Sequence, residues 1–209
     1  MSIAPPSFST DAVEIVTREE FSAGRYRVER FKLRHKLFRG GWTELLERDV
    51  VQRGQAAALL PYDPVSDVVL LVEQFRIGAM RAGQSPWMLE VVAGLIEAND
   101  ETPEAVARRE SAEECGCIVS TLEPIATYLP SPGLTTETLH LFCGRIDSRD
   151  APRHAGLLEE GEDLRVHAWP WSKARRALDQ GVFANAATLI ALHWLARHRT
   201  ALRQRWIGA

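Results

Sequence analysis

Three glutamates in the middle of the chain have the types and spacing of a metal-binding cluster. Glu110, Glu113 and Glu114 stand at positions i, i+3 and i+4, so a helix would present all three carboxylates on one face. Like charges at this spacing repel each other and destabilise the helix that carries them. A small divalent cation such as Mg²⁺ prefers hard oxygen ligands and would offset the repulsion. The spacing therefore indicates a cation site, with a solvated acidic helix face as the alternative.

The residues around the cluster favour the cation site, because they define a short helix with clear ends. Thr102 followed by Pro103 is typical of an N-cap and a first helical residue. Gly116 is typical of the left-handed residue just past a helix C-terminus. Upstream, the apolar residues 91–93 end at Gly94. The pattern predicts a strand, a loop and then a helix that carries the carboxylates in its second half.

Residues 94–117 resemble the signature of the Nudix hydrolases, which is a glycine, a glutamate and then REUxEExGU, where U is a bulky apolar residue. The matching positions are Gly94, Glu101, Arg109, Glu110, Glu113, Glu114 and Gly116. The loop after the glycine holds one residue more than the signature, and Ser111 and Cys117 stand at positions that are usually more apolar. An insertion ahead of the helix leaves the ligand spacing intact.

This resemblance implies a metal-dependent enzyme that hydrolyses a pyrophosphate linkage, with Mg²⁺ as the cofactor and Mn²⁺ as a substitute ion. Metal ions neutralise bridged phosphates, orient their oxygens and lower the pKa of a bound water. By the resemblance, Glu113 is a weaker contributor, and Arg109 pairs with Glu101 to brace the loop against the helix. The metal ligands that the resemblance implies are Glu110, Glu114, the backbone carbonyl of Ala93, and Glu162.

The helix offers no general base, and the acidic residues 158–163 are the candidate source of one. A solvated acidic loop is the alternative interpretation. In the resembled family this loop closes over the site and carries the base and one more metal ligand. Aligned backwards from Asp163, the base is Glu160 and the ligand is Glu162, and a shift of two residues would exchange the assignment. Gly161 would give the loop the freedom to swing as a lid.

Further segments resemble the ADP-ribose pyrophosphatase family within the Nudix hydrolases, over nearly the whole chain. They are Arg53-Gly54, residues 60–64, 73–76 and 86–90, and the tripeptide Ser131-Pro132-Gly133. The tripeptide alone is an ordinary turn sequence, but its place shortly after the signature helix is diagnostic of that family. Leu134 follows it where a glycine is common.

The resemblance implies hydrolysis of ADP-ribose to AMP and ribose 5-phosphate. One alternative is another nucleoside diphosphate sugar, such as GDP-mannose, hydrolysed by the same residues. The other is a non-catalytic domain that binds ADP-ribose, which is disfavoured because the chain keeps every glutamate of the signature.

The substrate contacts are expected from cations for the phosphates and from flat side chains for the base. Arg76 follows a buried strand and would bind a phosphate bidentately, and Tyr26 would stack on the adenine. The alternatives are a core position for Tyr26 and a surface charge for Arg48. The residues expected to contact the substrate are Tyr26, Arg48, Asp49, Arg53, Arg76, Leu95, Ser131, Pro132, Gly133 and Glu137.

The elements that must position these residues begin with an antiparallel sheet. We expect strands over residues 12–16, 25–35 and 42–51. Gly40 and Gly41 predict a turn, and a shift in the apolar alternation near Glu29 and Arg30 predicts a bulge. We assign residues 1–52 to this N-terminal β module. The resemblance implies that the module is exchanged across a homodimer.

Residues 53–209 form the second predicted domain, with longer apolar runs. Buried strands are expected over 56–60, 68–72, 87–92, 125–129, 139–146 and 164–169, and helices over 172–180 and 185–203. This order predicts an α+β fold with helices on both sides of a mixed sheet. The resemblance implies the same Nudix αβα sandwich, preceded by the antiparallel module.

The composition limits which binding partners and which cellular compartment we expect for this protein. The net charge is −3, and no window rich in Lys and Arg predicts a nucleic-acid groove. Cys115, Cys117 and Cys143 lack CxxC spacing and indicate reduced thiols in the cytoplasm. The N-terminus does not have the pattern of a signal peptide, and no apolar run has the length of a membrane span. We therefore expect a cytoplasmic protein with a small-molecule substrate and no membrane or nucleic-acid partner.

Overall fold

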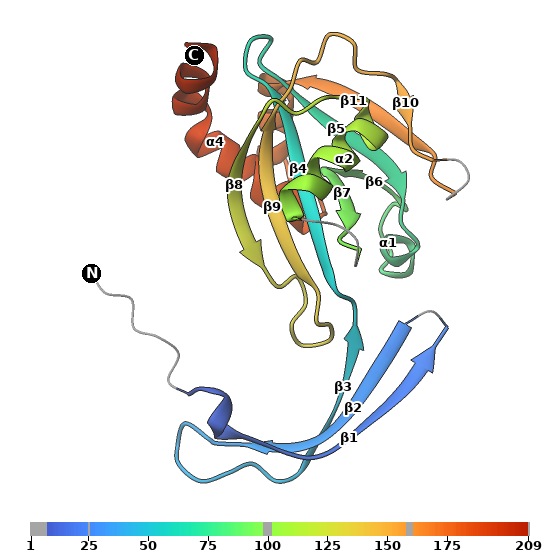
Figure 1. Ribbon diagram of the computed structural model, residues 1–209, viewed down its shortest axis with the longest axis vertical. Helices are drawn as coiled ribbons and strands as arrows, with labels where there is room; N and C mark the ends of the chain where they lie inside the picture. Colours follow the sequence, from blue (N-terminus) through green and yellow to red (C-terminus); the bar gives the residue numbers. More distant parts are fainter. Residues whose placement is uncertain (1–7, 25, 98–101, 158–160, 209) are drawn as a thin grey trace. The chain divides into compact units, whose positions relative to one another are not determined.

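The chain folds into two compact units, each with its own sheet. The computed structural model describes residues 8–24, 26–97, 102–157 and 161–208 (Figure 1). The first unit ends at Gly54 but also includes Ser131–Glu137, and the second unit consists of Gln55–Pro130 and of the chain from Thr138 onward. A loop that is distant in sequence therefore belongs with the N-terminal residues.

The first unit is a three-stranded antiparallel sheet in the order β1-β2-β3. A short 3-10 turn, η1 (Thr10–Ala12), precedes β1 (Val13–Ala23), β2 (Tyr26–His35) and β3 (Leu46–Gln52). The loop Ser131–Glu137 is attached to β3 through its backbone. The N–H of Val51 donates to the carbonyl of Leu134 at 2.8 Å, and the N–H of Thr136 donates to the carbonyl of Val51 at 3.1 Å.

The bulge predicted near Glu29 and Arg30 is wrong, because β2 pairs without interruption there. The register shifts instead in β1, just after Ile15. Glu29 takes a buried position in the strand, and its carboxylate accepts hydrogen bonds from the side chains of Arg18 and Gln52. A charged residue at a buried position interrupts the apolar alternation in the sequence without interrupting the strand.

The second unit is built on a mixed sheet in the order β10-β11-β5-β4-β9-β8, with β6 paired to β5 and β7 paired to β4. Strand β4 runs parallel to β9, and the other pairs are antiparallel. The strands are β4 (Gln55–Asp63), β5 (Val68–Phe75), β6 (Trp87–Glu90), β7 (Val92–Leu95), β8 (Thr121–Tyr128), β9 (Thr138–Arg145), β10 (His154–Ala155) and β11 (Leu164–Pro170).

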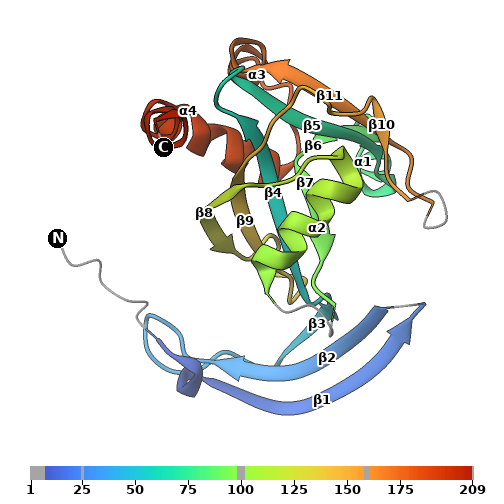
Figure 2. The same cartoon turned by 45° about the horizontal axis from the view of Figure 1, so that its top comes forward.

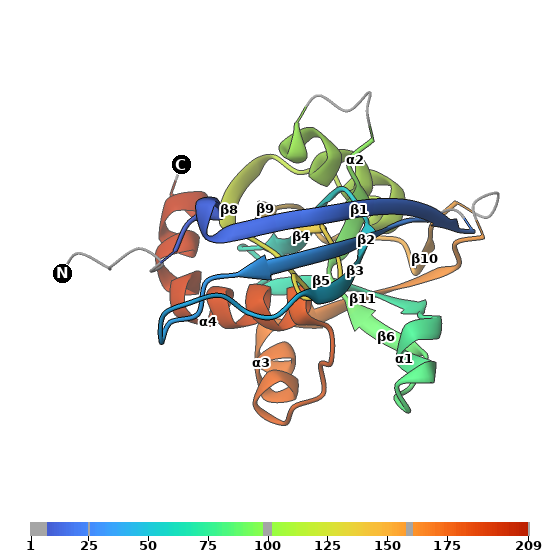
Figure 3. The ribbon, with the colours of Figure 1, turned by 90° about the horizontal axis from the view of Figure 1, so that it is seen from below.

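Helices cover both faces of this sheet. Helix α2 (Pro103–Cys115) packs on one face, and α3 (Trp171–Asp179) and α4 (Ala186–Ile207) pack on the other (Figures 2 and 3). A short helix, α1 (Ile77–Arg81), connects β5 to β6. The predicted α+β fold, an αβα sandwich with a mixed sheet, preceded in the chain by an antiparallel module, is confirmed. Among the described residues, none of the helices combines the length and the apolar composition that a membrane span requires.

The central strands supply side chains to two separate cores. Toward α2 lie Ala57, Leu59, Leu70 and Val72, packed with Val106 and Ala107. Toward α4 lie Ala58, Leu60, Tyr62 and Leu71, packed with Leu192 and Leu195. Strands buried on both faces have continuous apolar runs instead of an alternation. This is why the runs at 56–60 and 68–72 are visible in the sequence as buried strands.

Several boundaries differ from the sequence-based expectation. The strand predicted over 42–51 begins at Leu46, and the run 87–92 is two short strands, β6 and β7, that pair with different partners. Helix α1 was not predicted, since it has only five residues and its N-cap, Arg76, makes no side-chain capping hydrogen bond. Such short elements depend on tertiary contacts more than on local propensity.

Candidate active site

Helix α2 has the ends that its sequence predicts. The side chain of Thr102 accepts a hydrogen bond from the N–H of Ala105 at 3.1 Å, and Pro103 opens the helix. Gly116 closes it in the left-handed conformation, at φ 65°, and its N–H donates to the carbonyl of Ala112 at 3.1 Å. These caps fix where the helix starts and stops. The three glutamates therefore lie in its second half, and the helix packs beside β7.

Glu110 lies directly against the backbone of Gly94 in β7. A Cβ at residue 94 would overlap the carboxyl group of Glu110. The Glu110 side chain is only 12% exposed. The glycine is therefore required at this position, because its missing side chain is what allows the carboxylate to approach the strand.

Glu114 is fixed one turn further along α2. Glu114 as a whole is 3% exposed, and its Oε2 accepts a hydrogen bond from the N–H of Ala93 at 3.1 Å. Burial raises the pKa of Glu114 to about 8, and the charges of Glu110 and Glu162 add to this effect. Burial also raises the pKa of Glu110, helped by repulsion from Glu113 and Glu162.

These carboxylates fit a divalent cation in their chemistry. Glu110, Glu114 and Glu162 are hard oxygen donors near enough to repel each other, and a cation would supply the missing counter-charge. Within the described ranges, no group of three or more His, Cys, Asp or Glu side chains is arranged so that it could hold a metal ion. A cation here would need further oxygens, such as the backbone carbonyl of Ala93.

Arg109 binds the outer side of the cluster. Its Nη1 donates to Oε2 of Glu113 and also contacts Oε1 of Glu110, both at 2.9 Å. The predicted partner Glu101 lies outside the described residues. The carbonyl of Glu113 accepts from the N–H of Gly156 at 3.4 Å, so this glutamate also connects α2 to the segment before the acidic loop.

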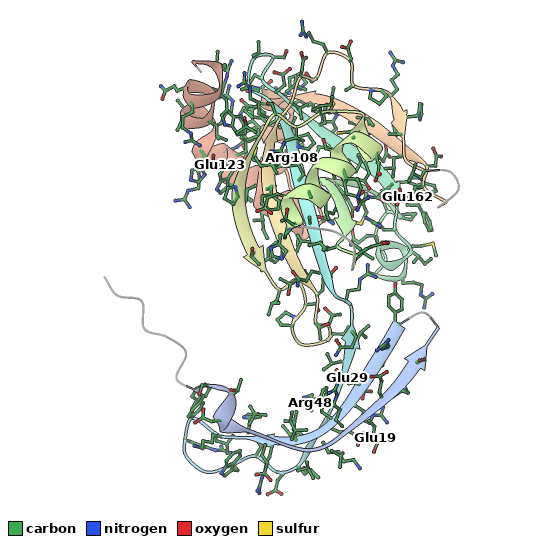
Figure 4. The ribbon with its side chains drawn as sticks, in the orientation of Figure 1. Glu19, Glu29, Arg48, Arg108, Glu123 and Glu162 are labelled. Carbon is green, nitrogen blue, oxygen red and sulfur yellow. The ribbon has the colours of Figure 1, made fainter. Side chains whose placement is uncertain are left out.

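The acidic loop is described only in part, and the predicted base Glu160 lies outside the described residues. Glu162 is described, and its N–H donates to the carbonyl of Leu157 at 3.1 Å (Figure 4). Gly156 and Gly161 have φ values of 93° and 75°, which favour glycine. The negative charge of Glu162 contributes to the raised pKa of both Glu110 and Glu114, so this predicted ligand is near enough to interact with the two carboxylates.

Arg76 and Leu95 are the predicted substrate-binding residues of the second unit. Arg76 follows β5, and its Nη2 lies 2.9 Å from Oε2 of Glu90. The positive charge of Arg76 acts to lower the pKa of Glu114, against the larger effect of burial. Leu95 ends β7 and is 46% exposed. Leu95 directly follows Gly94, the residue against which the Glu110 carboxylate lies.

In the first unit, the structure brings Tyr26, Arg53 and Glu137 together. Nη1 of Arg53 donates to the Tyr26 hydroxyl at 3.2 Å, and the guanidinium lies 5.5 Å from the centre of the Tyr26 ring. Nε of Arg53 lies 3.7 Å from Oε1 of Glu137. The tripeptide at 131–133 forms a turn, in which the carbonyl of Ser131 accepts from the N–H groups of Leu134 and Thr135. Pro132 and Gly133 are exposed at this turn.

Arg48 and Asp49 are adjacent in β3, so their side chains point to opposite faces of the first sheet. Asp49 accepts two hydrogen bonds from Arg30, at 2.7 and 2.8 Å. Nη1 of Arg48 donates to the carbonyl of Glu47 at 2.8 Å (Figure 4 labels Arg48). The structure does not bring these two predicted residues together, and Asp49 is already engaged by an arginine.

Sequence reasoning gave no role to Glu90. This residue is 4% exposed at the end of β6 and is the partner of Arg76. A signal was present, because Glu90 is an acidic residue inside the apolar run 87–92. A buried charge must be paired, so its position pointed to a polar network.

The sequence of the chain is similar to a known family model and to several named proteins. Residues 52–191 match the family model described as the NUDIX domain. The chain is 42% identical over 202 residues to a protein of Escherichia coli (strain K12) named ADP-ribose pyrophosphatase, and the match covers 97% of this chain and 96% of that protein. It is 35% identical over 150 residues to a protein of Cronobacter sakazakii named GDP-mannose pyrophosphatase, covering 71% and 77% of the two chains.

A solved structure also has a similar fold. It is described as the crystal structure of an ADP compounds hydrolase, with a TM-score of 0.66 and 21% sequence identity, and the match covers 92% of this chain and 98% of that chain. At this identity the similarity concerns the fold.

Proposed function

Because the chain belongs to the Nudix family, we propose that it is a metal-dependent hydrolase of ADP-ribose that releases AMP and ribose 5-phosphate. The observation that carries the chemistry is the pair of buried glutamates, Glu110 and Glu114, held against Ala93 and Gly94 of β7. The near full-length similarity to an ADP-ribose pyrophosphatase supports the substrate. Nudix enzymes generally depend on a divalent metal, and we propose Mg²⁺ as the ion, with Mn²⁺ as a substitute.

Glu110, Glu114, Glu162 and the carbonyl of Ala93 would hold the cation. When bound, it neutralises the diphosphate and lowers the pKa of an attacking water. Gly94 lets the Glu110 carboxylate approach the strand, and the Ala93 N–H orients Glu114. These contacts preorganise the oxygen donors before substrate binds.

The proton of the attacking water needs an acceptor. We propose Glu160 as this general base, with Glu162 as the alternative. Glu160 would take the proton as the new phosphorus–oxygen bond forms and the bridging oxygen leaves with the other product. Arg76 would bind the phosphate oxygens through the part of its guanidinium that does not contact Glu90.

The proposed contacts to the rest of the substrate are residues of the first unit and Leu95. Tyr26 offers an aromatic ring for the adenine. Arg53 contacts this ring and pairs with Glu137, so both charged side chains lie close to Tyr26. Arg48, Asp49, Ser131, Pro132 and Gly133 complete the proposed set. Backbone hydrogen bonds between Val51 and residues 134 and 136 attach this loop to β3.

We also propose that the protein is a cytoplasmic homodimer that exchanges its N-terminal module. Support for an interface comes from exposed apolar side chains of the first sheet, Val13, Ile15, Val16 and Phe21. Support for a reducing compartment comes from the three cysteines, which are all buried and unbridged. Light scattering coupled to size exclusion would measure the oligomeric state.

A second candidate substrate is GDP-mannose, favoured by the similarity to the Cronobacter sakazakii protein. The metal-binding residues would act in the same way on either compound. The decisive experiment is to measure nucleoside monophosphate release from ADP-ribose and from GDP-mannose, each with Mg²⁺ and with EDTA. We expect Mg²⁺-dependent AMP release with the higher kcat/KM for ADP-ribose. A higher kcat/KM for GDP-mannose would overturn the substrate assignment, and release in EDTA would overturn the metal dependence.

A further inference from the structure

Glu90 is the centre of a buried hydrogen-bond network that reaches three separate elements. Its Oε2 accepts from Nε2 of Gln74 in β5 and from Nε of Arg76, both at 3.0 Å. Its Oε1 accepts from Nδ2 of Asn185, the N-cap of α4, at 2.9 Å. Each of these contacts brings a donor to the carboxylate, so the network suits an acceptor-only group at residue 90.

The orientation of Asn185 is fixed independently of Glu90. Its Oδ1 accepts from the N–H of Thr188 at 3.0 Å and from the Thr188 hydroxyl at 3.2 Å, as expected for a helix N-cap. The amide NH₂ must therefore point away from the helix, toward the carboxylate. The hydroxyl of Thr188 also accepts from the N–H of Val91, the residue after Glu90. Helix α4 thus holds both the side chain of Glu90 and the backbone beside it.

Arg76 gains orientation from this network. Both Nε and Nη2 lie within 3.0 Å of Oε2 of Glu90, whereas the side chain as a whole is 47% exposed. An exposed arginine without such a partner samples many rotamers, and ordering it on substrate binding costs free energy. The contact with a buried, immobile carboxylate restricts the guanidinium before the substrate arrives.

We propose that Glu90 is a positioning residue that holds Arg76 in the orientation that binds the diphosphate, and that Asn185 fixes Glu90 from the N-terminus of α4. This inference rests on the proposed function, because it assigns Arg76 to the phosphate. It connects a helix on one face of the sheet to a site whose carboxylates come from the helix on the other face.

A merely structural role for Glu90 makes a different prediction. If the network only stabilises the fold, removing Glu90 lowers the free energy of unfolding, and its effect on the activity of the folded protein is the same with and without Arg76. If Glu90 acts through Arg76, its removal has little effect once the arginine is gone. A double-mutant cycle separates the two cases.

The cycle consists of wild type, Glu90→Gln, Arg76→Ala and the double variant. kcat and KM for ADP-ribose are measured with Mg²⁺, and thermal unfolding is measured for each protein. We expect Glu90→Gln alone to lower kcat/KM by about ten- to a hundredfold, since small misplacements of a binding group have effects of this order. In the Arg76→Ala background we expect a change of less than about twofold. Equal effects in both backgrounds would overturn the inference.

Asn185→Ser provides a second route if Glu90→Gln does not fold. Serine keeps the N-cap of α4 but loses the Nδ2 contact with Glu90. We expect a severalfold loss of kcat/KM in the wild-type background and none with Arg76→Ala. The matched control is Asp67→Asn, which removes a carboxylate paired with Arg199 elsewhere in the same unit. It should lower the unfolding temperature and leave kcat/KM unchanged.

Wild-type turnover separates this inference from the proposed function. An active wild type with additive effects overturns only the role of Glu90. If the wild type releases no AMP, the proposed hydrolysis is refuted, and the same cycle is run on the dissociation constant for ADP-ribose. Non-additivity there supports the positioning role, additivity overturns it, and an absence of binding overturns both proposals.

Discussion

The carboxyl group of Glu110 occupies the space that a side chain at residue 94 would fill. Gly94 belongs to β7 and Glu110 to α2, so the contact joins the strand and the helix at the point where the metal-binding oxygens are proposed to gather.

Gly94→Ala should displace the Glu110 carboxylate without unfolding the protein. The new methyl group overlaps the end of a side chain, which can rotate away, so the fold is retained. We expect kcat/KM for ADP-ribose to fall by about a hundredfold, because a ligand moved by about 1 Å no longer fits its cation. Titration of AMP release with Mg²⁺ measures the effect, and circular dichroism checks the fold. An unchanged Mg²⁺ dependence would contradict the proposed geometry.

Glu114→Gln should remove metal binding and keep the stability of the metal-free protein. The amide oxygen can still accept from the N–H of Ala93, and the change relieves repulsion from Glu110 and Glu162. We expect turnover to be nearly abolished. The unfolding temperature of the wild type should rise on addition of Mg²⁺, since a ligand that binds only the folded state stabilises it. The variant should show no such rise, and normal turnover in the variant would refute the assignment.

Asp67 should contribute stability that is lost in acid. Its Oδ1 accepts from Nε of Arg199 at 2.7 Å and from the Tyr62 hydroxyl at 2.8 Å. Burial acts to raise the pKa of Asp67, but these partners outweigh it and hold the pKa below the ordinary value. The stabilisation is therefore fully present above the unfolded-state pKa of about 3.9, and it disappears as the pH falls through the lower folded-state value.

Asp67→Asn tests this pH dependence. Asn tolerates the left-handed backbone of this residue, at φ 57°, so the substitution chiefly removes the charge. We expect a loss of about 1–3 kcal/mol at pH 7, as for hydrogen bonds that involve charged groups. Urea unfolding at a series of pH values should show the difference between the two proteins shrinking below pH of about 4. A constant difference would mean that the effect is not electrostatic.

Gly133→Ala should show whether residue 133 contacts the substrate or is a glycine only because of the backbone conformation of the turn. A Cβ at residue 133 would meet open space, and its φ is not in the left-handed region. The unfolding temperature should therefore be unchanged, while KM for ADP-ribose rises if the tripeptide contacts the substrate. Gly116→Ala is the contrasting control, because Gly116 is left-handed and close to Pro152. It should cost about 1 kcal/mol or more, and an unchanged KM in Gly133→Ala would remove this residue from the proposed site.

Local rules explain which parts of the site were visible in the sequence. Thr102, Pro103 and Gly116 bound α2 through caps that involve only neighbouring residues, so the helix and the placement of its glutamates follow from spacing alone. The buried strands at 56–60 and 68–72 are equally visible, because burial on both faces requires apolar residues at every position. The bulge at Glu29 was mispredicted, since periodicity cannot show that a buried charge has partners on the neighbouring strands.

The sequence by itself determined the carboxylate-bearing helix, the α+β class and, through its signature, the family. Tertiary structure decided which groups meet. Gly94 receives the carboxylate of Glu110, the loop Ser131–Glu137 joins the N-terminal unit, and Glu90 binds Asn185, 95 residues away along the chain. The physical reason is that spacing along a helix or strand fixes only neighbours within a few residues. Contacts between distant residues depend on how two layers of helices close over one sheet, and that packing is a property of the whole fold.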